Sequence, residues 1–128
     1  MPSRLVASLG RQAAALFAAG RNSLDGLRFL LQERAFRLEA LALAAGVLAA
    51  PFIARDVKEC VVLVGAIVAV LAVEALNTAI EQVCNLVTRE FRPEIKAAKD
   101  CASCAVTLSL VVCGALWLAA AGDRLGMW

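Results

Sequence analysis

The pattern of hydrophobic and polar positions divides the chain into an amphipathic N-terminal stretch and three long apolar segments. The apolar segments cover about residues 38–54, 60–87 and 102–121. A helix rises about 1.5 Å per residue, so about 20 residues cross the hydrocarbon layer of a bilayer. The first segment is short and contains Pro51, which is expected to kink or end it, and the second is long enough to leave the layer from about Glu81. The pattern predicts three transmembrane helices.

Residues 1–34 are predicted to form an interfacial helix region and not a fourth span. At helical spacing the polar side chains fall on one face and the apolar ones toward the other: Arg4, Ser8 and Arg11 against Leu5, Leu9, Leu16 and Phe17. Gly20 is expected to close this first run. Asn22 or Ser23 is then expected to cap a second short helix. The alternative is a basic tail without fixed structure.

Composition makes a membrane the expected solvent. The 128 residues are 62% hydrophobic and only 5% aromatic, and the mean hydropathy is +0.78. This exceeds what a soluble domain of that length can bury. A net charge of +2 gives no reason to expect a nucleic-acid partner. The five cysteines, with no histidine in the chain, are interpreted as buried packing residues.

The placement of lysine and arginine predicts the orientation. Six arginines lie within the first 37 residues, and the link between the second and third spans carries Arg89, Arg92, Lys96 and Lys99. The link between the first two spans carries only two cations, which two acids offset. Because positive loops stay on the cytoplasmic side, the N-terminus and the second link are predicted to face the cytoplasm.

The second span carries a polar stripe. Glu74, Asn77 and Glu81 fall within an arc of about 60° on a helix. A carboxylate at mid-bilayer costs about 2.5 to 3.5 kcal/mol on insertion scales, so Glu74 is expected to be functional. Asn77 alone is explained equally well as a helix-pairing group.

The spacing of the two glutamates limits their roles. Seven residues separate Glu74 from Glu81, about 10 Å along the axis, so one small cation cannot bind both. Glu81 therefore needs a partner, and Glu74 is free to act as a base. The acids that remain for that partnership on the predicted cytoplasmic side are Asp25, Glu33, Glu39, Glu90, Glu94 and Asp100.

The cationic link beside Glu81 suits a polyphosphate. Magnesium is commonly held by one or two carboxylates together with water and phosphate oxygens, which this arrangement provides. The chain has no G-x-x-x-x-G-K-[ST] motif, so a nucleotide site here is not a P-loop.

Three segments resemble the signatures of the small bacterial diacylglycerol kinases. They are Glu33-Arg-Ala-Phe-Arg-Leu-Glu39, Glu74-Ala-Leu-Asn-Thr-Ala-Ile-Glu81 and Ala98-Lys-Asp-Cys-Ala-Ser103, and the likeness extends from about Asn22 to Leu118. The resemblance implies an all-α membrane protein, in which an interfacial N-terminal helix precedes three transmembrane helices. It also implies a homotrimer in the bacterial inner membrane, with the active site toward the cytoplasm. The whole chain, 1–128, is then one membrane-embedded domain.

The resemblance also implies roles for individual residues. Glu74 matches the general base, Glu33 and Glu81 match the Mg²⁺ ligands, and Asn77 lies beside the base. Matches to ATP-binding residues are Glu33, Asn77, Glu81, Glu90, Phe91, Arg92, Lys99 and Asp100. Matches near the lipid substrate are Ser23, Arg37, Glu39, Glu74 and Ser103. The N-terminal arginine that contacts nucleotide in the family is Arg4 or Arg11 here.

Two positions depart from the family pattern. Asn85 stands where the family commonly has aspartate, and Ala102 where glycine usually precedes the serine. The change at Asn85 keeps a hydrogen-bonding group and loses a charge, which leaves the base and the metal ligands in place.

The expected activity is ATP- and Mg²⁺-dependent phosphorylation of 1,2-diacylglycerol to phosphatidic acid. An undecaprenol kinase is the nearest alternative, because relatives of this family phosphorylate undecaprenol. An oligomeric proton or cation conductor is more distant, since the polar stripe does not continue through residues 60–73. A non-enzymatic assembly subunit leaves Glu33, Glu81 and Lys99 without a use.

Overall fold

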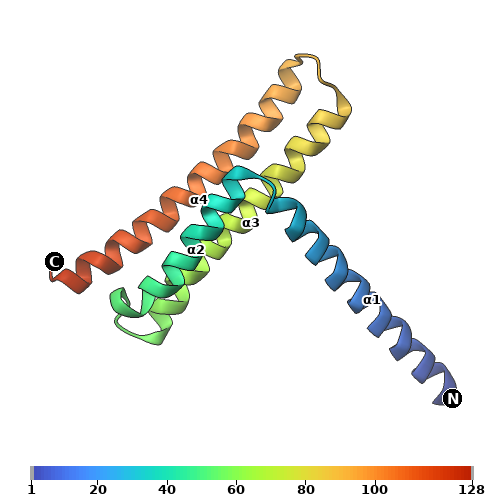
Figure 1. The fold of residues 1–128 in the computed structure, drawn as a ribbon, viewed down its shortest axis with the longest axis horizontal. Coiled ribbons are helices and arrows are strands. Elements are labelled where there is room, and N and C mark those ends of the chain that lie inside the picture. Colours follow the sequence, from blue (N-terminus) through green and yellow to red (C-terminus); the bar gives the residue numbers. More distant parts are fainter. Residues whose placement is uncertain (1, 128) are drawn as a thin grey trace. The chain divides into compact units, whose positions relative to one another are not determined.

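The computed structural model describes residues 2–127, with the side chains of residue 12 and of 14–127 (Figure 1). It contains four α-helices in this range: α1 (Pro2–Leu30), α2 (Arg34–Ile53), α3 (Val57–Val87) and α4 (Pro93–Leu125). The chain divides into two compact units, Met1–Glu33 and Arg34–Trp128. The all-helical class predicted from the sequence is confirmed.

The first unit is one continuous helix, α1, followed by a turn. The prediction that Gly20 ends a first helix is wrong, because α1 passes through it to Leu30. The Ser23 hydroxyl donates to the Ala19 carbonyl at 3.1 Å and does not cap a new helix. A glycine inside a helix costs only about 1 kcal/mol, which the surrounding alanines and leucines offset. The predicted faces of α1 depend largely on residues 4–11, whose side chains lie outside those described.

The second unit contains three helices that are long and apolar enough to cross a membrane. Helix α2 ends two residues after Pro51, as expected. Helix α4 is much longer than the predicted span 102–121, because it begins at Pro93, a residue suited to the first helical turn. Its first eight residues include several polar ones, so the apolar pattern did not include them in the predicted span. Gly126, at φ 66°, ends it.

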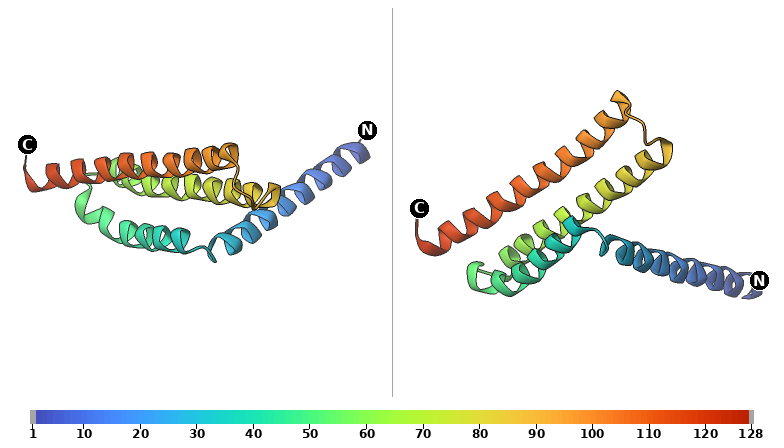
Figure 2. Two further views of the ribbon diagram at one scale, coloured as in Figure 1. Left: turned by 90° about the horizontal axis from the view of Figure 1, so that it is seen from above. Right: turned by 45° about the horizontal axis from the view of Figure 1, so that its top comes forward.

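Helix α3 lies between the other two helices of this unit. It packs extensively against both α2 and α4, whereas α2 and α4 touch each other at few positions. Figures 1 and 2 show that α2, with 20 residues, runs beside only the half of the 31-residue α3 that adjoins the α2–α3 loop. The far half of α3 therefore pairs with α4 alone, as a helical hairpin.

Small residues let the three helices meet closely at one level. A Cβ atom on Gly46 of α2 would lie 2.3 Å from Cδ1 of Ile67 on α3, and 3.3 Å from the Trp117 ring on α4. The Trp117 indole N–H donates to the Leu63 carbonyl of α3 at 3.1 Å. This junction joins all three helices, as expected where packing and not water exclusion holds helices together.

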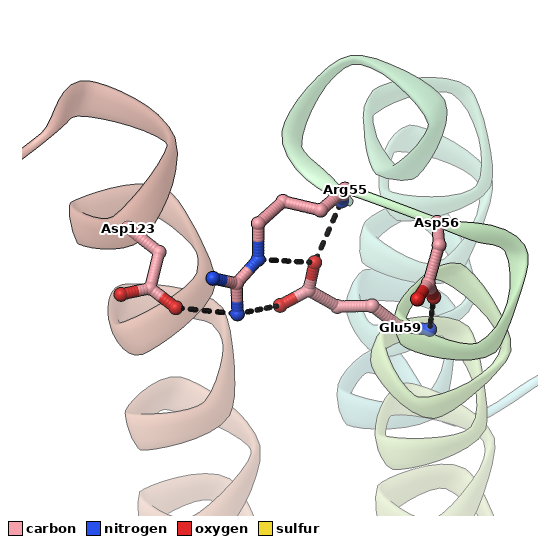
Figure 3. A network of polar contacts seen from close by, with 4 residues as sticks. All are labelled: Arg55, Asp56, Glu59 and Asp123. Atoms are coloured by element: carbon pink, nitrogen blue, oxygen red, sulfur yellow. Dashed lines mark hydrogen bonds and ion pairs between the residues drawn. The ribbon is translucent and has the colours of Figure 1, made fainter.

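A polar network closes the end of this unit opposite the α3–α4 hairpin turn (Figure 3). Asp56 caps α3 by accepting the Glu59 backbone N–H at 2.8 Å. The Arg55 backbone N–H donates to the Glu59 carboxylate at 2.6 Å, and its guanidinium pairs with Asp123 of α4, also at 2.6 Å. These contacts tie the α2–α3 loop to the end of α4. Arg55, Glu59 and Asp123 are called the Arg55 network below.

Large apolar side chains remain exposed along all three helices of the second unit. Among them are Leu48, Phe52, Leu86 and Leu118. In water, this much exposed apolar surface would drive association, so the bilayer is the natural solvent of these faces. The prediction that the cysteines are buried fits Cys84, but it is wrong for Cys101 and Cys104, which are exposed on α4.

Candidate active site

Glu74 lies on the face of α3 that packs inside the protein. Its exposed fraction is 6%, and it shares a buried stripe with Leu63, Val70 and Thr78 at spacings of seven and four residues. These spacings return to one side of a helix, so the packing that buries the two apolar residues also buries the carboxyl group. The acid therefore does not face lipid.

Asn77 is the polar neighbour of Glu74 one turn along the helix. Its side-chain N–H donates to Glu74 Oε2 at 3.3 Å, while its own Oδ1 is buried and has no hydrogen-bond partner among the described residues. Glu81, two turns from Glu74, is exposed. The predicted stripe thus runs from a buried carboxyl group to an accessible one, about 10 Å apart along α3.

A second carboxyl group, from Glu39 on α2, lies close enough to Glu74 for the two to interact electrostatically. Glu39 Oε2 is also buried without a hydrogen-bond partner among the described residues. Two nearby carboxyl groups in an apolar region repel one another when both are charged. The pair therefore favours a hydrogen-bond donor between them, such as a hydroxyl group.

An apolar groove begins at Glu39 and continues between the three helices of this unit. Its volume is about 470 Å³. Small residues of α2 form one wall and larger side chains of α3 and α4 form the other. The lining residues are Glu39, Ala42, Ala45, Gly46, Ala49, Ile67, Val70, Leu110, Cys113, Gly114 and Trp117. The groove is an apolar channel with a carboxyl group at one end.

A larger and more polar cavity lies where α3 turns into α4. We call it the hairpin pocket, and its volume is about 740 Å³. Four cations and two acids line it, together with amide, hydroxyl and apolar groups. The lining residues are Gln82, Asn85, Leu86, Thr88, Arg89, Glu90, Phe91, Arg92, Ile95, Lys96, Lys99 and Asp100. The surplus of positive charge suits a polyanion.

Local structure sets the positions of these side chains. Thr88 ends α3, and its hydroxyl accepts the Glu90 backbone N–H at 3.1 Å, which shapes the turn. Lys96 forms an ion pair with Asp100 one turn along α4. Lys99 reaches across to α3, where its ammonium donates to Asn85 Oδ1 at 2.7 Å. The Phe91 ring is 78% exposed at the mouth of the pocket.

The structure brings some of the predicted residues together. Of the predicted ATP-binding residues, Glu90, Phe91, Arg92, Lys99 and Asp100 share the hairpin pocket, while Asn77 and Glu81 are not among its lining residues.

Of the predicted lipid-site residues in the second unit, Glu39 lies close enough to Glu74 for an electrostatic interaction. Arg37 and Ser103 are exposed and lie outside the groove.

Glu33 and Ser23 belong to the first unit, so their pairing with Glu81 and with the lipid residues stays a prediction. No group of three or more His, Cys, Asp or Glu residues within the described part of the chain is arranged to hold a metal. Magnesium is commonly held by only one or two carboxylates together with phosphate oxygens. The exposed carboxylate of Glu81 offers the hard oxygen donor that such a site needs.

Sequence reasoning missed the apolar groove and the role of Asn85 as the partner of Lys99. The groove depends on how α2 and α4 pack on α3, which periodicity does not report. Asn85 was visible only as a departure from a family pattern, and its separation from Lys99 by 14 positions in the sequence hides their contact.

The fold and these two cavities define a class of protein: an integral membrane protein that brings a polyanion pocket and an acid-lined apolar groove to one helix. Comparison with known sequences identifies the family. The family described as prokaryotic diacylglycerol kinase matches residues 21–121. The chain belongs to this family and is a lipid kinase, which confirms the predicted enzyme class over an ion conductor or an assembly subunit.

Individual relatives agree with this assignment. A diacylglycerol kinase of a Sinorhizobium species is 36% identical over 104 residues, covering 81% of this chain and 75% of its own. The diacylglycerol kinase of Escherichia coli K12 is 33% identical over 103 residues, covering 80% and 84%. The Helicobacter pylori enzyme of the same name is 32% identical over 103 residues, covering 80% of each chain. As a kinase, the protein uses ATP as phosphate donor, typically with a metal ion.

Proposed function

We propose that the protein transfers the γ-phosphate of ATP to the primary hydroxyl of 1,2-diacylglycerol, giving phosphatidic acid and ADP, with Mg²⁺ present. The observation that carries this proposal is the burial of Glu74 on the packed face of α3, beside Asn77 and Glu39. A buried acid is costly in a membrane protein, and one that faces a second carboxyl group needs a use. Proton abstraction from a substrate hydroxyl supplies that use.

The chemical step needs only one base and a well-placed acceptor. The Glu74 carboxylate takes the hydroxyl proton as the lipid oxygen forms a bond to the γ-phosphorus. The bond from that phosphorus to the β–γ bridging oxygen breaks, and ADP leaves with the electron pair. Such transfer depends mainly on positioning and on charge stabilisation, which a small helical scaffold can provide.

The hairpin pocket is the proposed site for the phosphates of ATP. Arg89, Arg92 and Lys99 offer positive charge there, and Lys99 is the proposed partner of the transferring phosphate. Phe91, an exposed residue of the pocket lining, is proposed to stack on the base of the nucleotide. Glu90 and Asp100 complete the proposed nucleotide contacts.

Glu81 and Glu33 are the proposed ligands of Mg²⁺, and bound Mg²⁺ would neutralise phosphate charge. Glu81 lies between the level of Glu74 and the hairpin pocket along α3, which suits a ligand placed between base and phosphates. The two carboxylates, with phosphate oxygens, form the small ligand set that magnesium uses in kinases.

The apolar groove is the proposed site of an acyl chain. Glu39 stands at one end of the groove and interacts with Glu74, so a lipid with its chain in the groove presents its hydroxyl to both carboxyl groups. Arg37, Ser23 and Ser103 are proposed to contact the polar part of the lipid.

We further propose that three copies of the chain assemble in the inner membrane, with the hairpin pocket toward the cytoplasm and α1 at the interface. The excess of lysine and arginine at the α3–α4 turn supports this orientation. The exposed apolar faces of α2, α3 and α4 leave surface for both lipid and neighbouring subunits.

The test is phosphate transfer by the purified protein in mixed micelles, with diacylglycerol and undecaprenol offered separately. Glu74→Gln should lower kcat by about 10² to 10⁴, the usual contribution of a general base. Glu59→Gln is the matched control, because it makes the same change on the same helix within the Arg55 network and far from the site.

Full turnover by Glu74→Gln would reject the base. Transfer to undecaprenol at a higher kcat/KM than to diacylglycerol would replace the proposed acceptor while keeping the chemistry.

A further inference from the structure

The contact between Lys99 and Asn85 joins the two arms of the helical hairpin inside the hairpin pocket. The Lys99 ammonium on α4 donates to Asn85 Oδ1 on α3 at 2.7 Å. Lys99 is half-buried, whereas the surrounding cations Arg89, Arg92 and Lys96 are exposed. A half-buried lysine with a short hydrogen bond holds its charge at a defined place, which exposed and flexible cations do not.

The two lysines of the pocket have partners of different charge. Lys96 pairs with the Asp100 carboxylate, so much of its charge is cancelled nearby. The partner of Lys99 is an uncharged amide oxygen, which orients the ammonium without cancelling its charge. An ammonium has three N–H donors, so one bond to Asn85 leaves two for phosphate oxygens.

We propose that Asn85 is a positioning residue that holds Lys99 against the phosphates of the donor nucleotide, and that the neutrality of Asn85 sets the affinity for that nucleotide. This inference rests on the proposed use of the hairpin pocket for ATP. Asn85 acts through Lys99 and needs no contact with the nucleotide itself. Its amide gives the orientation of a salt bridge without the competing negative charge.

Two substitutions separate the contact from the charge. Asn85→Asp keeps the shape and the hydrogen bond but adds a negative charge beside the phosphates, so KM for MgATP should rise roughly tenfold with kcat changed less than about twofold. Asn85→Ala removes the contact and adds no charge, so KM should rise only about threefold. Ala97→Glu is the control for added charge, because Ala97 is an exposed α4 residue that does not line the pocket.

Binding without turnover provides a second readout. The magnesium complex of adenosine 5′-(β,γ-imido)triphosphate, titrated by calorimetry in the absence of lipid, should follow the same order: wild type, Asn85→Ala, then Asn85→Asp as the weakest. In a Lys99→Met background Asn85→Ala should alter the Kd by less than about twofold, because the group it acts through is gone, whereas Asn85→Asp should still weaken binding through its own negative charge. Unchanged far-ultraviolet circular dichroism checks that the variants fold.

The outcomes distinguish this inference from the proposed function. A wild-type protein that transfers phosphate, together with an Asn85→Asp variant of unchanged KM and Kd, would overturn the role of Asn85 and leave the kinase intact. Equal effects of Asn85→Asp and Asn85→Ala would overturn the role of neutrality. An effect of Asn85→Ala that persists in the Lys99→Met background would show that Asn85 does not act through Lys99. A wild-type protein without transfer to any lipid would instead refute the proposed function.

Discussion

At the scale of single residues, burial separates the proposed roles of the acids: a buried base and an exposed metal ligand. The sequence placed Glu74 deeper in the bilayer than Glu81, and in the structure Glu74 is buried whereas Glu81 is exposed. The difference arises because Glu74 falls on the packed stripe of α3, and Glu81 lies beyond the start of α2. Burial likewise separates Glu39, whose Oε2 atom is buried, from Arg37, which is exposed.

Gly46 provides a residue-scale prediction about packing. Gly46→Ala would place a Cβ atom 2.3 Å from Ile67 Cδ1, so the variant should lose about 1 to 3 kcal/mol of stability. Ile67→Val removes that Cδ1 atom, and the double variant should recover most of the loss. Thermal unfolding in detergent measures both.

Gly65→Ala is the matched control for Gly46→Ala, since a Cβ atom at Gly65 has no neighbour within 4 Å. It should be neutral or slightly stabilising, because alanine favours a helix more than glycine does. Equal destabilisation by the two alanines would contradict the close approach at Gly46.

At the scale of elements, the α3–α4 hairpin forms a pocket, whereas the α2–α3 loop forms contacts that join helices. The hairpin extends past α2 and forms the hairpin pocket from one continuous stretch, residues 82–100. The loop at the other end carries the Arg55 network, which ties α4 to the start of α3. The hairpin pocket and the Arg55 network are therefore at opposite ends of α3.

The Arg55 network provides an element-scale prediction about salt. The hydrogen bond to Glu59 and then the charge of Asp123 raise the pKa of Arg55. Because the pKa is raised, the contribution of these ion pairs to stability is present at neutral pH and is lost only when the pH rises above the guanidinium pKa. Salt is therefore a more practical probe of this contribution than pH. Arg55→Ala should lower the Tm by a few degrees at most, since the side chain is 60% exposed.

The difference in Tm between Arg55→Ala and wild type should shrink in 1 M salt, where the Debye length is about 3 Å. Arg124→Ala, an exposed neighbour outside the network, serves as control. A Tm difference that is independent of salt would show that Arg55 acts by packing and not by charge.

At the scale of the whole molecule, the exposed apolar surface of the three spans is suited to a membrane. A single chain leaves large apolar side chains exposed on all three spans, and its described residues hold no metal cluster of their own. The family membership gives the activity, while the site needs a lipid surface, a nucleotide and a metal ion to act. Function here is a property of the embedded, loaded protein.

Metal removal tests this dependence. Chelation of Mg²⁺ should abolish transfer without changing the helix content, because the ion is held with the nucleotide and does not build the fold. Glu81→Gln should raise the Mg²⁺ concentration needed for half-maximal rate by roughly tenfold or more. Circular dichroism and rate measurements at graded Mg²⁺ check both statements.

A loss of helix content on chelation would show a structural metal instead. A Glu81→Gln protein with an unaltered Mg²⁺ requirement would remove Glu81 from the metal site.

The sequence by itself determined the helical class, the three spans and the residues that could carry chemistry. Those features follow from local pattern: apolar runs of membrane length, a polar stripe at helical spacing, and cations gathered between two spans. The apolar run alone did not show how far a helix extends beyond it, as at Pro93. Local pattern erred where glycine does not interrupt a helix, as at Gly20.

Only the tertiary structure decided which of these residues meet. Two hydrogen bonds join residues that are far apart in the sequence: Lys99 with Asn85, and Trp117 with Leu63. Glu39 and Glu74 are also distant in the sequence, and the packing of α2 on α3 brings them close enough to interact electrostatically. Helical periodicity fixes the face on which a side chain lies, but the packing of neighbouring helices fixes what that face touches. The two cavities that support the proposed function exist only through that packing.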